Sequence, residues 1–129
     1  MKKGAKRIFV ADDDPDILDI LKLMLQTRGY EVLVSNTGNE LYKYSPDELP
    51  DLILLDIWMS GIDGRDICAW LKNNETTRDI PVLFISANSN IHAITKEYCA
   101  DGFIAKPFDM NTLLNKVREM LTVRATQEI

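Results

Sequence analysis

Cysteine and histidine, the side chains that most often build transition-metal and disulfide sites, are scarce in this sequence. Its 129 residues include two cysteines, Cys68 and Cys99, and a single histidine, His92. The cysteines lack the spacing of metal ligands and fall among apolar residues of expected helices. We therefore expect reduced, semi-buried thiols of the kind found in cytosolic proteins. His92 is expected at the surface.

Long apolar runs are also missing from the sequence. No stretch approaches the length that spans a membrane. The basic residues at positions 1–7 are followed by only a short apolar segment, 8–11, before the acids begin, which is too short for the core of a signal peptide. We therefore expect a cytoplasmic protein that does not associate with membranes.

Positive charge is outnumbered by negative charge. There are 15 lysines and arginines against 20 aspartates and glutamates, which gives a net charge of −5. This balance argues against non-specific nucleic-acid binding by the domain as a whole. With 46% hydrophobic and 27% charged residues, the composition is that of a globular protein, and the length suits one domain with a substantial core.

Short apolar segments alternate with segments whose apolar residues recur at helical spacing. This pattern predicts a strand followed by a helix, repeated five times with short connections, which requires a parallel sheet with helices on both faces. We expect a single three-layer α/β domain over 1–129, with a core from about 6 to 121 and a fraying tail at 122–129. The expected strands are 8–11, 31–34, 52–55, 81–85 and 103–105, and the expected helices 15–28, 37–44, 63–72, 89–99 and 109–121.

Polar side chains follow four of the five expected strands. Asp12 and Asp13 follow the first strand, Asp56 the third, Ser86 the fourth and Lys106 the fifth. Because the carboxyl ends of parallel strands share one edge of a sheet, we expect these five side chains to converge there, where open α/β sheets bind ligands.

The three converging carboxylates would repel one another. A pair at ~4 Å costs about 4 kcal/mol at an effective dielectric constant near 20. A magnesium ion would relieve this repulsion, because Mg²⁺ prefers carboxylates, water and phosphate oxygens as ligands. The alternative is that the acids only cap the following helix, a role that suits Asp14.

A lysine and a serine complete the expected site. Lys106 precedes Pro107, and a cis peptide bond between them would aim the ammonium group at a carboxylate or phosphoryl oxygen. Ser86 can bond a phosphoryl oxygen, or it can belong to the start of the next helix. Together the groups form a site for phosphoryl transfer in which a carboxylate accepts the phosphate.

Four motifs lie in order at these strand ends: VADDDP at 10–15, LDIWMSGIDG at 55–64, ISA at 85–87 and AKPF at 105–108. With them, the chain resembles the receiver domain of two-component response regulators over about residues 6–121. The resemblance implies a flavodoxin-like, doubly wound (βα)5 sandwich with the parallel strands in the order 2-1-3-4-5. It also implies a signalling surface made of 89–99, 103–105 and 109–121, through which a homodimer could form.

The resemblance assigns a role to each converging residue. Asp56 is expected to accept phosphate from a sensor histidine kinase or a histidine phosphotransfer protein. Mg²⁺ would be held by Asp12, Asp13, Asp56 and the backbone carbonyl of Trp58. Lys106 would bind the phosphate, and Ser86 and Phe103 would form the switch that responds to it.

The loop after the phosphoacceptor departs from the family pattern. Ser60 stands where the family usually has proline, and we expect it to loosen the loop. Trp58 and Asn88 occupy the variable positions that tune dephosphorylation in the family. A bulky indole can restrict the attacking water, so we expect slow loss of phosphate.

The favoured hypothesis is a phosphorylation-controlled binding module and not a dedicated enzyme. Such a module catalyses at most its own phosphorylation and dephosphorylation. The alternative is a Mg²⁺-dependent phosphohydrolase of flavodoxin-like topology, which would need a second acid where Trp58 stands. A flavodoxin-like cofactor binder is disfavoured because acids replace the phosphate-cradling loop.

Within the family, three roles remain open for this chain: a stand-alone receiver, a phosphorelay intermediate or an excised receiver of a larger protein. No output domain is recognisable at 122–129, so direct nucleic-acid binding is not expected. The sequence does not identify the downstream partner.

Overall fold

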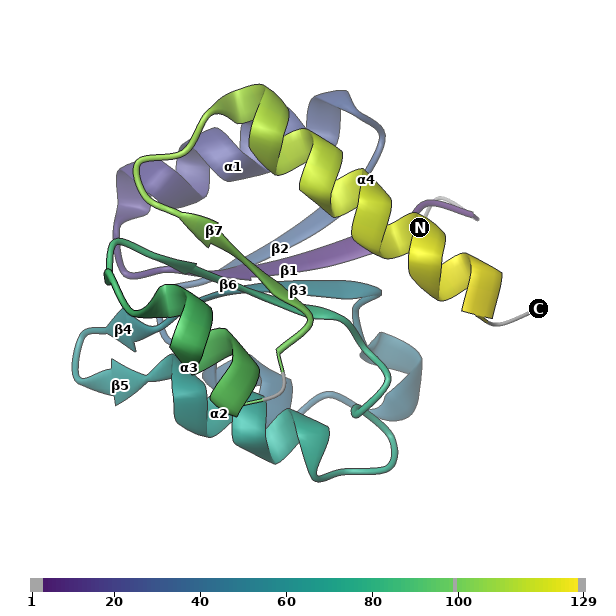
Figure 1. Cartoon of the computed structure of the whole chain (residues 1–129). Coiled ribbons are helices and arrows are strands. Elements are labelled where there is room, and N and C mark those ends of the chain that lie inside the picture. Colours follow the sequence, from purple (N-terminus) through teal and green to yellow (C-terminus); the bar gives the residue numbers. More distant parts are fainter. Residues whose placement is uncertain (1–3, 99, 128–129) are drawn as a thin grey trace.

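Five short strands form one parallel sheet in the computed structural model, which describes residues 4–98 and 100–127. The strands lie in the order β2-β1-β3-β6-β7, with β3 at the centre (Figure 1). This is the predicted order 2-1-3-4-5, because β6 and β7 are the fourth and fifth strands expected from the sequence. Their bounds are β1 Arg7–Ala11, β2 Glu31–Ser35, β3 Leu52–Asp56, β6 Val82–Ser86 and β7 Gly102–Ala105.

The described helices cover both faces of this sheet (Figure 1). On one face lie α1, Pro15–Thr27, and α4, Met110–Gln127; on the other lie α2, Gly64–Lys72, and α3, Ile91–Glu97. Since both faces are covered, every residue of β3 and β6 is buried, which explains their nearly continuous apolar sequences.

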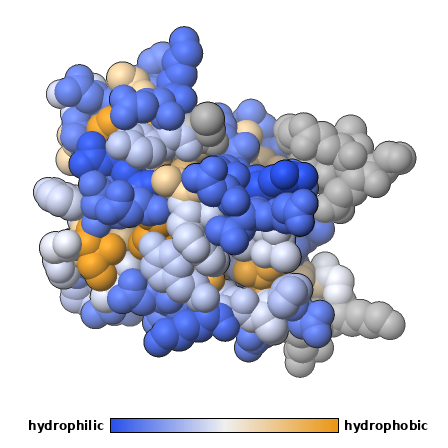
Figure 2. Space-filling view, turned by 90° about the horizontal axis from the view of Figure 1, so that it is seen from below, coloured by the Kyte–Doolittle hydropathy of each residue, from blue (hydrophilic) through white to orange (hydrophobic). Residues whose placement is uncertain are grey.

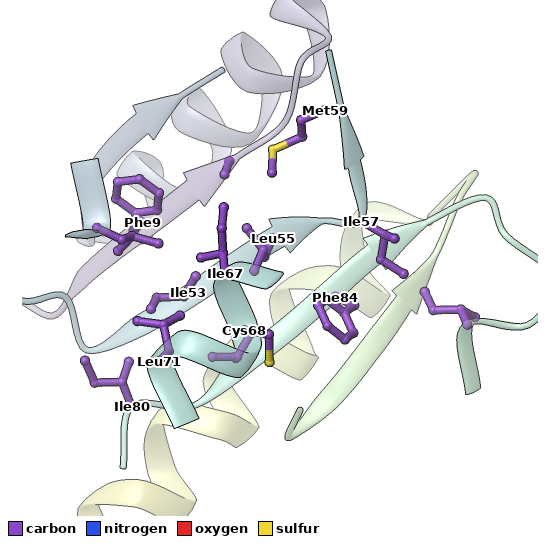
Figure 3. Packing of buried hydrophobic residues seen from close by; sticks show 14 residues of the cluster. Phe9, Ile53, Leu55, Ile57, Met59, Ile67, Cys68, Leu71, Ile80 and Phe84 are labelled. Atoms are coloured by element: carbon purple, nitrogen blue, oxygen red, sulfur yellow. The ribbon is translucent and has the colours of Figure 1, made fainter. Parts of the chain in front are cut away.

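Two hydrophobic clusters, one on each face, hold the layers together. Alternate residues of each strand point to opposite clusters, as the pleat of a strand requires. The cluster beneath α2 is shown in Figure 3, where Phe9 of β1, Leu55 of β3 and Phe84 of β6 face Ile67 and Cys68 of α2. The outer face of this side of the molecule is mostly hydrophilic, with a few small hydrophobic areas (Figure 2).

Aspartate side chains cap the starts of three helices, as expected from the sequence for Asp14. The Asp14 side chain accepts a hydrogen bond from the Asp16 N–H at the start of α1, and the Asp63 side chain accepts one from the Arg65 N–H at the start of α2. The Asp109 side chain likewise accepts a hydrogen bond from the Thr112 N–H at 3.1 Å.

The prediction of a helix over 37–44 is wrong. Two 3₁₀ turns replace it, η1 at Asn39–Tyr42 and η2 at Pro46–Glu48. Gly38 has a φ of 80° directly before the first turn, and Ser45 and Glu48 form a capping box around the second. These local alternatives leave too few residues for a regular helix.

Other differences concern the ends of helices. The expected helix over 89–99 is shorter, at Ile91–Glu97, and the side chain of Cys99 lies outside the described residues. The expected tail at 122–129 is helical up to Gln127, because α4 continues to that residue and no glycine or proline interrupts it. Residues 128–129 lie outside the described part. None of the described helices combines the length and the apolar character needed to span a membrane.

A small hairpin that the sequence did not predict follows β3. β4, Trp58–Met59, pairs antiparallel with β5, Ile62–Asp63. The Gly64 N–H donates to the Ile57 carbonyl at 2.6 Å and closes the hairpin against the end of β3. The hairpin therefore lies directly beside the edge of the sheet where Asp56 emerges.

Gly64→Ala tests how tightly this hairpin is packed. A Cβ at position 64 would overlap the backbone carbonyl oxygen of Asp56. Since backbone cannot move aside easily, we expect a loss of roughly 3 kcal/mol in the free energy of unfolding. Chemical denaturation measures it.

The matched control is Gly61→Ala. This glycine has a φ of 84° but open space around its Cβ position, so only backbone strain of roughly 1 kcal/mol is expected. Equal losses in the two variants would contradict the packing argument.

Candidate functional site

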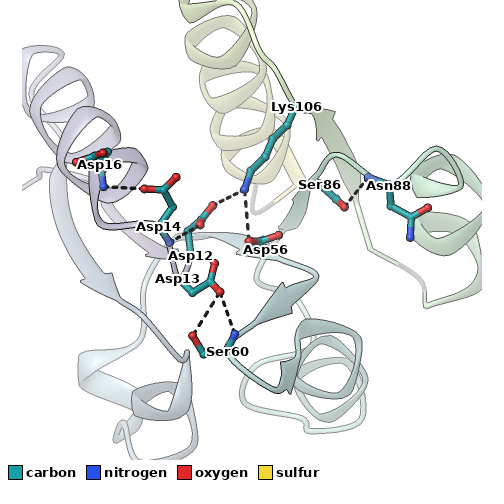
Figure 4. A network of polar contacts seen from close by, with 9 residues as sticks. All are labelled: Asp12, Asp13, Asp14, Asp16, Asp56, Ser60, Ser86, Asn88 and Lys106. Atoms are coloured by element: carbon teal, nitrogen blue, oxygen red, sulfur yellow. Dashed lines mark hydrogen bonds and ion pairs between the residues drawn. The ribbon is translucent and has the colours of Figure 1, made fainter.

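The carboxyl ends of four strands bring the predicted residues to one edge of the sheet (Figure 4). In the register of the sheet, Ala11 pairs with Leu55, Asp56 with Ile85, and Ser86 with Ala105. The residues at or just after these pairs therefore emerge side by side.

Lys106 is the centre of this arrangement. Its Nζ lies 2.8 Å from Asp12 Oδ2 and 3.4 Å from Asp56 Oδ2, so one ammonium group bridges acids from two strands. Asp12 is fully buried and Asp56 is 6% exposed. The peptide bond between Lys106 and Pro107 is cis, the conformation considered from the sequence for this position.

Three carboxylates form a cluster around this bridge. Asp12, Asp13 and Asp56 each present one oxygen, and these oxygens lie within 4.8 Å of one another. Asp14 is the helix cap, and its N–H donates to Asp12 Oδ1 at 2.9 Å. The capping explanation therefore holds for Asp14 and leaves the other acids pointing into the site.

A cavity of about 390 Å³ opens beside Asp56. Its lining includes three of the side chains singled out from the sequence besides Asp56 and Lys106: Trp58, Ser86 and Asn88. The hydroxyl oxygen of Ser86 accepts a hydrogen bond from the Asn88 N–H at 3.0 Å. Trp58 is 64% exposed, so its indole stands at the mouth of the cavity.

Phe103 does not line this cavity. It is half-buried on β7, and its ring meets the ring of His92 edge-on at a centroid distance of 5.7 Å. His92 is exposed, as predicted.

The pKa values of Asp56 and Lys106 follow from burial and from the contacts of Lys106 with Asp12 and Asp56. Burial is the largest cause that raises the pKa of Asp56 to about 6, and the negative charge of Asp12 is the second. Lys106 opposes the shift. Burial alone would lower the pKa of Lys106, but its hydrogen bonds to Asp12 and Asp56 and their charges outweigh burial and raise it. Lys106 therefore stays protonated at neutral pH.

Comparison with known proteins agrees with this geometry. The response regulator receiver domain family matches residues 8–118, which is most of the chain. The chain belongs to this family.

Individual relatives support the assignment. The receiver is 36% identical over 117 residues to the DNA-binding dual master transcriptional regulator RpaA of Synechocystis, covering 89% of this chain and 48% of RpaA. Among solved structures, the receiver domain of a signal transduction histidine kinase from Syntrophus aciditrophicus has a TM-score of 0.82 at 31% identity, covering 92% of this chain and 91% of the other.

A third relative was solved with ligands. TrrA from Thermotoga maritima, in complex with Mg²⁺-BeF, has a TM-score of 0.78 at 32% identity, covering 89% of this chain and 98% of the other. The chain spans about half the length of the curated relatives that it matches.

The donor set of this receiver fits a magnesium ion. Three clustered carboxylates present the hard oxygen ligands that Mg²⁺ takes, and the exposed side chain of Asp13 leaves the cluster accessible from solvent. The positive charge of Lys106 compensates only part of the negative charge of the cluster.

Sequence reasoning missed two features of this site. Arg65 lines the cavity, where its guanidinium is held by Asp63 at 2.7 Å and lies 5.9 Å from the ring of Tyr98. Ser60 contacts Asp13 through its N–H and its hydroxyl. The sequence signal that could have pointed to Arg65 is its position two residues after Asp63, the N-cap of α2. The Ser60 contacts run against the expectation that serine loosens the loop.

The raised pKa of Asp56 predicts a pH-dependent stability. Its pKa is 3.8 in the unfolded chain and about 6 in the folded receiver, so the folded state binds the proton more tightly. Stability is therefore lost as the pH rises from about 4 through 6. Asp56→Asn should stabilise the receiver by about 2–3 kcal/mol at pH 7.5.

Urea unfolding in a chelating buffer, repeated between pH 3.5 and 7.5, measures this difference. The gap between Asp56→Asn and wild type should close toward pH 3.5, where Asp56 is protonated in the folded state and mostly protonated in the unfolded state. A gap that is constant or widens at low pH would refute the assigned environment.

Proposed function

We propose that this receiver is a switch in a two-component system, in which Asp56 accepts a phosphoryl group from a sensor histidine kinase or a histidine phosphotransfer protein. The single observation that carries this proposal is the bridge from Lys106 to Asp12 and Asp56 beside a three-acid cluster. A cation is thereby fixed within reach of any phosphoryl oxygen on Asp56.

The transfer forms one bond and breaks one. A carboxylate oxygen of Asp56 attacks phosphorus, the bond from phosphorus to the donor histidine breaks, and its electron pair stays on the imidazole nitrogen. Lys106 moves from the carboxylates toward the new phosphoryl oxygens and neutralises their charge. Because its pKa is raised, Lys106 keeps its proton during this exchange.

Mg²⁺, when bound, neutralises negative charge on the transferred phosphoryl group. We propose that Asp12, Asp13, Asp56 and the backbone carbonyl of Trp58 hold it. The carboxylate cluster supports this set, and the Mg²⁺-BeF complex of TrrA shows such a ligand on a related receiver.

We propose that Ser86 and Phe103 read out the phosphorylation. The Ser86 hydroxyl lines the same cavity as Asp56, so it can donate to a phosphoryl oxygen once it leaves the Asn88 N–H. Phe103 lies on the adjacent strand β7, in contact with His92 of α3. A change at Ser86 would therefore reach the surface formed by α3, β7 and α4, where a protein partner or a second copy of the chain would bind.

The output is proposed to be protein binding, with no catalysis beyond self-phosphorylation and self-dephosphorylation. The net charge of −5 favours a protein over DNA as partner. RpaA is named as a DNA-binding protein, but this chain matches only about half of the length of RpaA. The cytoplasmic location and the choice between a stand-alone receiver and a phosphorelay intermediate stay predictions from the sequence.

Phosphorylation can be followed through Trp58. Adding acetyl phosphate or beryllofluoride with Mg²⁺ should change the fluorescence of this exposed indole, because it lines the cavity beside Asp56. The measurement uses a Trp70→Phe background, which removes the other tryptophan. No response, or an equal response in Asp56→Ala, would overturn the proposed function.

The indole of Trp58 should also protect the phosphorylated state. We expect Trp58→Asn to speed the loss of phosphate by roughly threefold to tenfold, because a smaller amide admits and orients water; this corresponds to about 1 kcal/mol of barrier. Radiolabelled phosphate remaining on the protein after removal of the donor gives the rate. Trp70→Phe serves as the control, and a decay in Trp58→Asn as slow as in wild type would contradict the idea.

A further inference from the structure

The hairpin after Asp56 turns in an uncommon way at Ser60. Trp58 pairs with Asp63 and Met59 with Ile62, which leaves Ser60 and Gly61 as a two-residue turn. Their φ angles are 45° and 84°. Positive φ at both central residues is the signature of a type I′ turn, whose twist suits a hairpin. A serine with positive φ is uncommon and is kept where surrounding contacts hold it.

Those contacts lead to the acid cluster. The Ser60 N–H donates to Asp13 Oδ2 at 3.0 Å, and the Ser60 hydroxyl lies 3.3 Å from the same oxygen (Figure 4). The two residues are 47 positions apart in the chain. Both donors meet one carboxylate oxygen, so they restrict the rotation of Asp13.

The side chain of Asp13 is less restrained by burial than the side chains of Asp12 and Asp56, so its hydrogen bonds matter more for its orientation. Asp12 is buried and bonded to Lys106 and to the Asp14 N–H, and Asp56 is buried and contacts Lys106. Asp13 is exposed, and Ser60 is the hydrogen-bond donor that the structure shows for its side chain. Hydrogen bonds to a carboxylate ligand orient it, and losing them commonly weakens metal binding by about 10–100-fold.

We propose that Ser60 is a positioning residue for the metal site: its turn holds Asp13 in place and raises the affinity of the unphosphorylated receiver for Mg²⁺. The inference rests on the proposed function in one respect, the binding of Mg²⁺ by this acid cluster. Proline at position 60 would remove the effect, because it has no N–H or hydroxyl and its φ is fixed near −65°.

Calorimetric titration of the phosphate-free protein with Mg²⁺ tests this proposal. Ser60→Pro should weaken binding about tenfold. Ser60→Gly keeps the N–H and favours positive φ, so it should restore most of the affinity lost in Ser60→Pro. If Ser60→Pro does not fold, as judged by circular dichroism, Ser60→Val decides, because a β-branched residue disfavours the turn and lacks the hydroxyl.

The possible outcomes separate the two proposals. If wild type binds Mg²⁺ and Ser60→Pro (or Ser60→Val in its place) binds it equally well, the role of Ser60 is overturned and the proposed function stands. If wild type does not bind Mg²⁺ at all, the proposed metal site fails as well. Loss in Ser60→Pro with rescue in Ser60→Gly supports the assignment of this role to the turn and its N–H. Equal loss in both variants overturns that assignment, because the hydroxyl, which both variants lack, would then hold Asp13 instead of the turn.

Discussion

Repulsion among Asp12, Asp13 and Asp56 is the constraint on which the rest of the site depends. Their oxygens gather within 4.8 Å, and Lys106 is held between two of them. Each close pair of carboxylates costs several kcal/mol at the effective dielectric constant of a protein edge. The raised pKa of Asp56 results first from burial and second from the repulsion by Asp12. A site with such repulsion favours the binding of a cation, and this is the property on which the proposed phosphoryl transfer to Asp56 depends.

The sheet makes this crowding unavoidable. Parallel strands all end at the same edge, and the buried strands β1 and β3 deliver their acids there from neighbouring positions. The helices on both faces protect the apolar parts of these strands, so the polar groups are confined to the edge. The loops that follow β3 and β6 then add Trp58 and Asn88 around the cavity beside Asp56. Scaffold and site are therefore consequences of the same strand pattern.

The loop after β3 contributes to two parts of the site. It forms a hairpin whose turn reaches back to Asp13, while its first residue, Trp58, leaves a large indole at the mouth of the cavity. The turn of the hairpin thus contacts one of the proposed metal ligands, and Trp58 lies where we propose that it limits the access of water to Asp56. Arg65, held at the start of α2 by Asp63, adds a second cation to the lining of the cavity.

The sequence by itself determined the alternation of strands and helices, both helical layers and the convergence of Asp12, Asp13, Asp56, Ser86 and Lys106, because apolar runs and strand ends are properties of contiguous residues. The strand order was implied by the resemblance to receiver domains. The tertiary structure alone decided the contact of Ser60 with Asp13 and the place of Arg65 at the cavity. Ser60 and Asp13 are distant in the chain, and the direction of the Arg65 side chain toward the cavity depends on how the surrounding loop folds. The 3₁₀ turns at Asn39–Tyr42 and Pro46–Glu48 were missed for a related reason, since weak helical periodicity yielded there to a left-handed glycine and a local capping box.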